Sequence, residues 1–350
     1  MRDVAIVGFA QSSSPAERER NEVEMVMPVV QGAVAASGIA SDEIGFTCSG
    51  SNDYLVGGPF SFVSALDAVG AWPPIRESHV EMDAAWALYE AWVQLQKGAV
   101  DSALVYGFGK TSTTDLAKLF TIQLDPYYVA PLWPDAHTMA ALQARAYLDA
   151  TGRNERDLAA VAACSRSAAA ENPDAVVDRP VSADDVLAEP FVAPPLHPSE
   201  CAPITDGAAA IVLAAGDLAR SVCERPAWIR GIDHRIDAHG LGVRALDRAT
   251  SAALAAEAVG VGTGPVDVAE LHASYAHEEL LLRDALGLRE DTTVNPSGGA
   301  LGANPVMATG LIRIGEAASR VIDGSAQRVV AHAAQGPCLQ QNLVCVMEGA

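Results

Sequence analysis

Six cysteines are the residues of this chain whose chemistry would matter most, because a thiolate is both a strong nucleophile and a metal ligand. They stand at irregular intervals, and none belongs to a C-x-x-C pair. This spacing excludes a zinc ribbon within the chain and argues against a disulfide scaffold. One thiol could still be a catalytic nucleophile, and its identity would decide the reaction type. The six are Cys48, Cys164, Cys201, Cys223, Cys338 and Cys345.

A glycine-rich stretch over residues 295–305 is the strongest local signal for a binding site. It reads Asn-Pro-Ser-Gly-Gly-Ala-Leu-Gly-Ala-Asn-Pro and leads into a predicted helix over residues 303–318. Adjacent glycines let a ligand approach the backbone, and the N-terminal amides of a helix attract anions. The alternative is a simple turn before a helix. A dinucleotide fold is disfavoured, because no G-x-G-x-x-G motif follows a strand here.

Acidic residues at two predicted helix starts admit a structural and a chemical interpretation. Glu81 and Asp83 open a predicted helix over residues 81–97, where carboxylates favour the free N-terminal amides. They could instead face a pocket, where one would act as a base or orient water. His277 and Glu278 lie at a second helix start. Because no H-E-x-x-H motif is present, a solvated, capped helix end is favoured there over a metal site.

Predicted strands and helices alternate along the chain, which indicates an α/β protein with a buried sheet. Residues 110–200 are richer in proline and polar groups, so we interpret them as an excursion of helices and loops over the core. A second half begins near Pro226, and its order of elements resembles that of the first. A duplicated unit and two unrelated domains are both compatible with this order. Strands are predicted over residues 4–9, 46–51, 102–109, 209–215, 228–232, 268–275, 328–332 and 343–347, and helices over 22–36, 81–97, 250–259, 278–285 and 303–318.

Length and charge narrow the class of protein further. The chain has 350 residues, enough for a sizeable core, and a formal net charge of −21. Such an acidic balance argues against binding to nucleic acid or to an anionic membrane surface. The apolar run over residues 4–9 is too short for an export signal and is predicted to be a strand. No apolar run is long enough to span a bilayer, so we expect a cytoplasmic protein.

Four stretches, taken in order, resemble the thiolase superfamily. Residues 295–310 resemble the N-x-x-G-G turn and helix of the C-terminal half, and residues 203–210 resemble the S-D-G-A-A-A strand entry. Residues 270–275, Glu-Leu-His-Ala-Ser-Tyr, resemble the H-D-C-F segment of sterol-carrier-type thiolases. The helix from Glu81 and the strand after it resemble the nucleophile helix and its next strand. The resemblance covers essentially the whole chain.

This resemblance implies a thiolase fold. Two similar βαβαβαββ halves would form a layered α-β-α-β-α core, with a loop domain inserted in the first half. Residues 1–225 would be the N-terminal half, including the loop domain at about 110–200, and residues 226–350 the C-terminal half.

The departures from the family decide the chemistry. Where thiolases have a nucleophilic cysteine in a C-A-S-G-like turn, this chain has Glu81-Met82-Asp83-Ala84. The G-H-P histidine is replaced by Asn304, and Cys338 lies past the place of the second cysteine. A buried packing role for Cys338 is favoured over a reactive thiol. Ordinary thiolysis, which needs a thiolate to take the acyl group, is therefore excluded.

Retro-aldol cleavage of a β-hydroxyacyl-CoA needs no thiolate, only donors for the thioester oxygen and a base for the β-hydroxyl. The resemblance assigns the oxygen to His272 and Asn304, and the proton to Tyr275, Asp83 or Glu81. The alternatives are a core histidine at 272 and simple packing at 275. His277 is a further candidate. No metal and no cofactor is expected beyond the CoA of the substrate, which is predicted to contact Gly298, Gly299, Ala303 and Gly336.

The most specific resemblance is to actinobacterial thiolase-like lipid-transfer proteins of steroid side-chain degradation. It is carried by residues 46–51, 72–75, 78–83 and 340–343. It implies an acyl-CoA substrate with a steroid side chain and a small zinc-ribbon/OB-fold partner. It also implies a dimer with itself or with a second thiolase-like chain. Two alternatives are a non-catalytic subunit that supports a catalytic paralogue, and a carrier of acyl-CoA or lipid.

Overall fold

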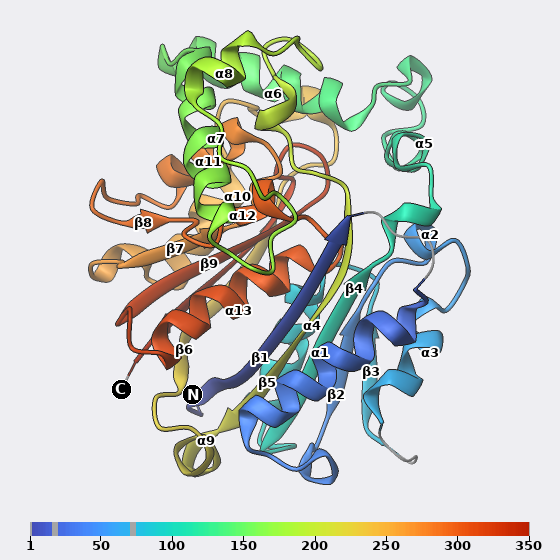
Figure 1. Cartoon of the computed structure of the whole chain (residues 1–350), viewed down its shortest axis with the longest axis vertical. Helices are drawn as coiled ribbons and strands as arrows, with labels where there is room; N and C mark the ends of the chain where they lie inside the picture. The colour runs from blue at the N-terminus through green and yellow to red at the C-terminus, as the bar shows by residue number, and fades with distance from the viewer. Residues whose placement is uncertain (1, 16–19, 71–74, 350) are drawn as a thin grey trace.

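The other strands of the first half lie on one side of a long N-terminal strand, which is drawn in dark blue in Figure 1. The computed structural model describes residues 2–15, 20–70 and 75–349. Across these residues the strands follow the order β3-β2-β4-β5-β1-β6-β10-β9-β7-β8. The first-half strands are β1 (Val4–Pro15), β2 (Thr47–Gly50), β3 (Glu77–Val80), β4 (Ser102–Gly109) and β5 (Thr205–Ala215). The second-half strands are β6 (Ala227–Ile236), β7 (Val268–Leu271), β8 (Thr293–Val294), β9 (Arg328–Gln335) and β10 (Gln341–Glu348).

The two halves have the same strand topology. In the first, β2 runs parallel to β3 and β4, while β5 runs antiparallel to β4 and β1. In the second, β7 runs parallel to β8 and β9, while β10 runs antiparallel to β9 and β6. The halves meet where β1 pairs antiparallel with β6, at Ala5↔Trp228 and Ile6↔Ala227. The order of elements was compatible with a duplicated unit and with two unrelated domains, and this topology is that of a duplicated unit.

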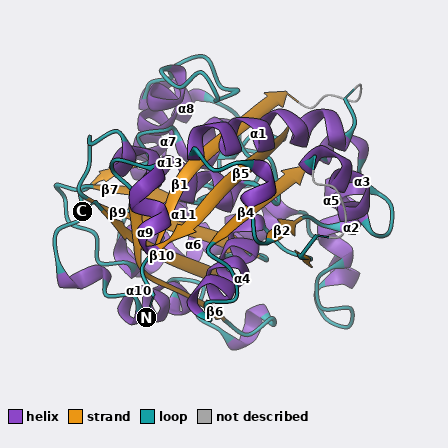
Figure 2. Ribbon diagram, turned by 90° about the horizontal axis from the view of Figure 1, so that it is seen from below, coloured by secondary structure: helices purple, strands orange, loops and turns teal. Residues whose placement is uncertain are grey.

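Helices divide the core into layers (Figure 2). Helices α4 (Ala84–Gln96) and α13 (Thr309–Ile322) share one apolar cluster with strands of both halves. Helix α1 (Glu22–Ser37) covers the outer face of the first half, and α10 (Thr250–Ala258) and α11 (Ala276–Ala285) cover that of the second. Since side chains alternate along a strand, β1 sends Val4 and Ile6 to the middle layer and Ala5 and Val7 towards α1. The predicted α-β-α-β-α thiolase fold is therefore confirmed.

The predicted excursion over residues 110–200 is helical and lies between β4 and β5 in sequence. Its helices are the green elements at the top of Figure 1, where α6 and α7 pack against α11 of the second half. Four of its helices are α5 (Leu116–Ile122), α6 (Ala136–Thr151), α7 (Glu155–Ala170) and α8 (Ala183–Ala188). Short helices elsewhere are α2 (Asp53–Val56), α3 (Ser61–Leu66), α9 (Gly216–Val222) and α12 (Gly299–Gly302). The loop domain thus reaches over the C-terminal half.

Several predicted boundaries were wrong, and three of them are explained here by local structure. Helix α4 begins at Ala84 and not at Glu81, because Asp83 adopts extended backbone and caps the helix. Helix α13 begins at Thr309 and not at 303, because α12 closes as a separate turn and Pro305 lies between the two. Strand β1 continues past residue 9, pairing with β5 through its polar end. Residues 72–74 of the resembling stretch 72–75 lie outside the described residues. None of the helices described here is long and apolar enough to cross a membrane.

Candidate active site

Four loop segments converge where β7 and β9 end and where α4 and α13 begin. The His272 backbone N–H donates to the carbonyl of His332 at 3.2 Å, which joins the segment after β7 to β9. The side chain of Gln335, at the end of β9, accepts from the backbone N–H of Asp83 at 2.8 Å. A carboxylate oxygen of Asp83 in turn accepts from the N–H of Gly310 in α13 at 2.9 Å. The structure therefore brings the predicted residues before α4, after β7 and before α13 to one place.

The ring of His272 is neutral and has a defined tautomer. It is buried, and burial lowers the pKa of its imidazole to about 3, so the ring carries no charge at neutral pH. Its Nδ1 accepts a hydrogen bond from the backbone N–H of Ala334 at 3.3 Å. The ring proton must then sit on Nε2. His272 is consequently a neutral hydrogen-bond donor, which suits an oxygen that gains negative charge during a reaction.

The amide of Asn304 is also oriented by a neighbour. Its Oδ1 accepts from the hydroxyl of Thr309 at 2.8 Å, and its backbone N–H donates to the hydroxyl of Thr205 at 3.0 Å. Because the carbonyl end of the amide is engaged, the Nδ2 end is the one that can donate to a ligand. Thr309 is the first residue of α13, so the helix that begins beside Asp83 also sets the rotamer of Asn304.

The carboxylate of Asp83 is held by backbone amides at the starts of two helices. It accepts from Ala85 in α4 at 2.9 Å and from Gly310 in α13 at 2.9 Å. A Cβ at Gly310 would lie 2.5 Å from the carboxylate, so this close approach requires glycine. Burial nevertheless raises the pKa of Asp83 to about 6. The amides of α13 that were expected to hold a ligand anion are therefore occupied by Asp83, and that expectation was wrong.

Glu81 lies on the outer side of the same turn. Its Oε1 accepts from the backbone N–H of Asp53 at 2.7 Å, and its Oε2 lies 3.2 Å from Nε2 of His79. Its side chain is 46% exposed. Between the two predicted roles for this residue, the geometry is that of a group capping the short helix α2.

The hydroxyl of Tyr275, in the segment after β7, lies beside the loop domain. Its hydroxyl lies 3.4 Å from Nδ1 of His137, and the two rings meet edge to face with centroids 5.8 Å apart. Burial, followed by the nearby carboxylate of Glu278, raises the pKa of the phenol far above its ordinary value. Tyr275 therefore stays protonated at neutral pH. His137 lies in the first turn of α6, and it belongs to no local motif by which the sequence could have singled it out.

The paired glycines of the 295–305 stretch pack against other residues of the same chain. Gly298 has a left-handed backbone, with φ of +93°, and a Cβ there would lie 2.6–2.8 Å from atoms of Ala169 in α7. A Cβ at Gly299 would lie 2.9 Å from the side chain of Asn295. Ala303 is buried, with an extended backbone. The glycines thus permit close packing of α7, and contact between these residues and a substrate stays a prediction.

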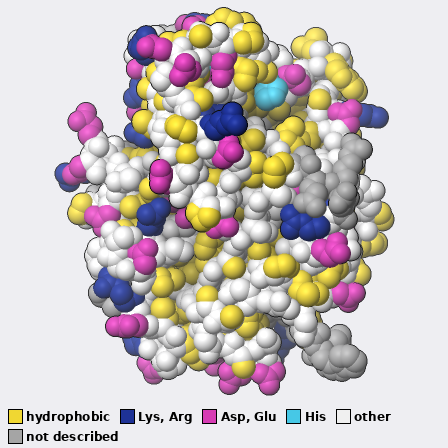
Figure 3. Space-filling model, in the orientation of Figure 1, with side chains coloured by type: hydrophobic (Ala, Val, Ile, Leu, Met, Phe, Trp, Pro, Cys, Tyr) yellow, Lys and Arg dark blue, Asp and Glu magenta, His cyan; other side chains and the backbone are white. Residues whose placement is uncertain are grey.

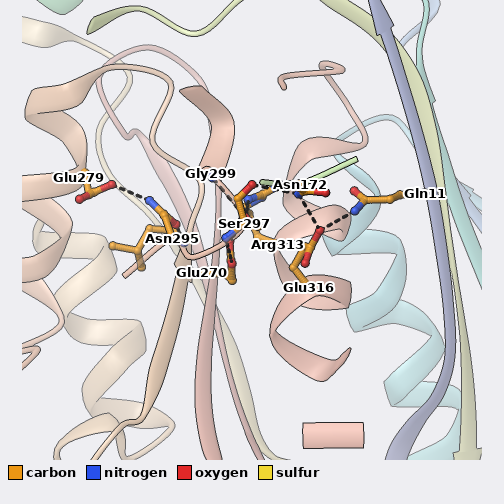
Figure 4. A network of polar contacts seen from close by, with 10 residues as sticks. Gln11, Asn172, Glu270, Glu279, Asn295, Ser297, Gly299, Arg313 and Glu316 are labelled. Atoms are coloured by element: carbon orange, nitrogen blue, oxygen red, sulfur yellow. Dashed lines mark hydrogen bonds and ion pairs between the residues drawn. The ribbon is translucent and has the colours of Figure 1, made fainter. Parts of the chain in front are cut away.

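A buried polar network ties the same stretch to the strand that carries His272 (Figure 4). Asn295 accepts from the backbone N–H of Leu271 at 2.7 Å and donates to Glu279 at 2.6 Å. The hydroxyl of Ser297 donates to Glu270 at 2.7 Å, and Arg313 of α13 forms an ion pair with Glu270 at 2.8 Å. Glu270 and Leu271 immediately precede His272. The network therefore fixes the end of β7 from which His272 projects.

The turn between β9 and β10 packs against α6. Gln143 of α6 donates to the carbonyl of Cys338 at 3.2 Å, and its other end lies 3.2 Å from Nε2 of His277. Arg244 also donates to the carbonyl of Cys338, at 2.8 Å. The Cys338 thiol is buried among apolar groups, donates to the Met139 carbonyl at 3.4 Å, and has its pKa raised to about 12 by burial. It is therefore a packing thiol.

Gly336 has a left-handed backbone in this turn, with φ of +77°. A Cβ there would lie 2.6 Å from the side chain of Gln340, so the turn itself uses the glycine. The prediction that Gly336 contacts the substrate is not tested by this packing. Within the described ranges, no three His, Cys, Asp or Glu side chains gather into a group suited to a metal ion.

Charged side chains of both signs are interspersed on the face shown in Figure 3. A surface hollow of about 370 Å³ on the loop domain is lined by Arg145, Arg153 and Arg156. Each of these arginines lies within 4.0 Å of a carboxylate, for example Arg153 at 3.0 Å from Asp284. The hollow therefore offers little net positive charge to the phosphates of a CoA thioester.

The buried carboxylate of Glu278 is predicted to make the stability of the folded chain depend on pH. Its carboxylate accepts from the backbone N–H groups of Ser274 and Tyr275, yet burial raises its pKa from the ordinary 4.5 to about 7. Below pH 4.5 the group is protonated in both states. Between pH 4.5 and 7 the folded state loses stability by about 1.4 kcal/mol per pH unit, so above pH 7 it is about 3 kcal/mol less stable than below pH 4.5.

Glu278→Gln should remove this dependence. Urea unfolding at pH 5 and pH 8 is expected to show the variant gaining stability relative to the wild type at the higher pH. Equal differences at the two pH values would contradict the raised pKa.

Comparison with known proteins places this geometry in a family context. The acetyl-CoA acetyltransferase of Methanothermobacter thermautotrophicus is 25% identical over 361 aligned residues, covering 93% of this chain and 94% of that protein. The 17-hydroxy-3-oxo-4-pregnene-20-carboxyl-CoA lyase of Mycobacterium tuberculosis is 26% identical over 235 residues, covering 64% of this chain and 61% of that protein. The solved Ltp2-ChsH2(DUF35) aldolase matches with a TM-score of 0.80 at 18% identity, covering 99% of this chain and 98% of that one. No family model matches the chain.

The chain therefore has a thiolase fold, and over most of its length it is similar to an acetyl-CoA acetyltransferase. Asp83 stands in the stretch that resembles the thiolase nucleophile turn, and the relatives include a 17-hydroxy-3-oxo-4-pregnene-20-carboxyl-CoA lyase as well as an acetyl-CoA acetyltransferase.

Proposed function

We propose that this chain catalyses retro-aldol cleavage of a β-hydroxyacyl-CoA with a steroid side chain, as a subunit of a larger assembly. The observation that carries the proposal is His272, a neutral donor fixed in a site that has lost the family's nucleophile. Such a donor can stabilise a thioester enolate, which retro-aldol cleavage generates without an acyl-enzyme. The names of the mycobacterial lyase and of the solved aldolase support the same reaction.

In the proposed reaction, His272 and Asn304 donate to the thioester oxygen through Nε2–H and Nδ2–H. A base removes the proton of the β-hydroxyl, the bond between the α- and β-carbons breaks, and its electrons form the enolate. A ketone leaves, and the enolate is protonated to a shorter acyl-CoA. Tyr275 is the remaining predicted candidate for the proton, because the carboxylates of Asp83 and Glu81 already accept hydrogen bonds from backbone amides.

The proposed enzyme also needs proposed partners, a compartment and a statement of its cofactors. We propose a dimer with itself or with a second thiolase-like chain, together with a small zinc-ribbon/OB-fold partner. The solved aldolase, named as an Ltp2–ChsH2(DUF35) pair, supports such an assembly. The arginines that line the surface hollow of the loop domain are paired with carboxylates, so a more basic partner would help to hold the CoA phosphates. The enzyme would work in the cytoplasm with no cofactor beyond the CoA of its substrate.

The test is turnover of a defined substrate by the chain purified with the proteins that co-purify with it. The probe is 17-hydroxy-3-oxo-4-pregnene-20-carboxyl-CoA, the compound in the name of the mycobacterial lyase. We expect release of a steroid ketone and a short acyl-CoA, unchanged in the control Cys338→Ala. Binding of the probe without turnover would indicate an acyl-CoA or lipid carrier. Thiolysis of a β-ketoacyl-CoA by this chain alone would overturn the proposal.

A further inference from the structure

The loop domain brings a histidine to the hydroxyl of Tyr275. His137 stands 138 positions away in the sequence, yet its Nδ1 lies 3.4 Å from the Tyr275 hydroxyl. Catalytic hydrogen bonds are often long in structures without substrate and tighten when it binds. The structure therefore places an imidazole nitrogen beside the phenol hydroxyl.

The phenol by itself cannot serve as a base. Burial and the adjacent Glu278 carboxylate raise the pKa of Tyr275, so a phenolate is not formed at neutral pH. A neutral hydroxyl takes up a proton only if it passes its own proton onward. An imidazole nitrogen with a free lone pair is the side-chain group best suited to receive it.

The position of His137 is fixed by the cap of α6 before it and by contacts of α6 after it. Asp135 caps the helix by accepting from the Thr138 backbone N–H at 2.7 Å. Gln143 joins the helix both to the Cys338 turn and to His277 of α11. Since α11 begins directly after Tyr275, these contacts hold the two rings in one arrangement.

From this arrangement, and resting on the proposed retro-aldol function, we propose that His137 is the proton-accepting and positioning residue that acts through Tyr275. The β-hydroxyl O–H bond breaks as a new O–H bond forms on Tyr275, while the original phenol proton moves to Nδ1 of His137. The bond between the α- and β-carbons breaks and gives the ketone and the enolate. The proton returns from His137 through Tyr275 to the α-carbon of the enolate, so neither an oxidant nor a further reactant is needed.

Three substitutions of His137 separate this relay from simple ring packing. His137→Phe keeps an aromatic edge against Tyr275 but has no acceptor, and His137→Gln keeps an acceptor but cannot carry the proton. In the co-purified complex, with the steroid-CoA probe, both should lower kcat by about 10²-fold, the low end for general acid–base catalysis, with KM changed less than about threefold. Added imidazole should restore turnover to His137→Ala. Exposed His239→Gln, outside the four loops, is the matched control and should keep wild-type turnover.

A second measurement guards against misfolded variants. Because both residues serve one relay, His137→Gln combined with Tyr275→Phe should lose no more activity than the worse single variant. Wild-type kcat in His137→Phe would overturn the relay while leaving retro-aldol cleavage intact. Losses in His137→Ala that imidazole does not restore, with multiplying effects in the double variant, would also overturn it. A wild-type complex that does not cleave the probe would overturn the proposed function and the relay together.

Discussion

His272→Ala is expected to lower kcat for cleavage of the steroid-CoA probe by about 10²–10³-fold, the usual effect of removing one oxyanion donor. The Nε2–H of His272 is available because Nδ1 is engaged by the Ala334 backbone, and burial keeps the ring neutral. The donor strengthens its bond only as negative charge develops on the thioester oxygen. The loss should therefore appear in kcat rather than in KM. Steady-state kinetics of the co-purified complex would measure it.

Asn304 provides the matched test of the same oxygen. Asn304→Ala should also lower kcat, and Asn304→His, which restores the family residue, should retain more activity than the alanine variant. The double variant should lose less than the product of the two single effects, because both donors act on one atom. Thermal unfolding of each variant would show that the loss is not one of folding. Wild-type turnover in both single variants would contradict the role and would favour a chain that supports a catalytic paralogue.

The alternation of elements was sufficient to predict the α/β class, because buried strands and capped helices leave local patterns. The polar end of β1 had no such pattern. Residues 11–14 are Gln-Ser-Ser-Ser, and they form strand only because β5 pairs with their backbone. Long-range pairing of this kind overrides local propensity.

Some residues of the candidate site could likewise be predicted from the sequence, and others could not. His272, Asn304 and Tyr275 stand in stretches that resemble family motifs, so the sequence could single them out as candidates. His137 could not be predicted, because its approach to Tyr275 depends on how the loop domain folds back over the second half. The glycines at 298 and 299 suggested a ligand, whereas α7 of the same chain occupies the space beside Gly298. A pair of glycines in a sequence indicates that some group approaches the backbone closely, but the sequence does not show which group it is.

The buried pair Glu270–Arg313 links the stability of the fold to the position of His272. Both side chains are almost fully buried, at 0% and 3% exposed, and Ser297 shares the carboxylate. Glu270 lies two residues before His272 on the end of β7, while Arg313 comes from α13, the helix that starts beside Asn304. Any change in this pair therefore affects the strand that carries one donor and the helix that orients the other.

Arg313→Met should lower the free energy of unfolding by about 3–5 kcal/mol, because it leaves the Glu270 carboxylate buried without its cation. Urea unfolding at neutral pH would measure the loss. Glu270→Gln combined with Arg313→Met should recover a large part of it, since the double variant leaves neither member of this pair charged. If the double variant recovers stability but not turnover, the network orients His272 as well as stabilising the fold. A double variant no more stable than Arg313→Met would contradict the charge argument and would assign the loss to packing of the arginine side chain.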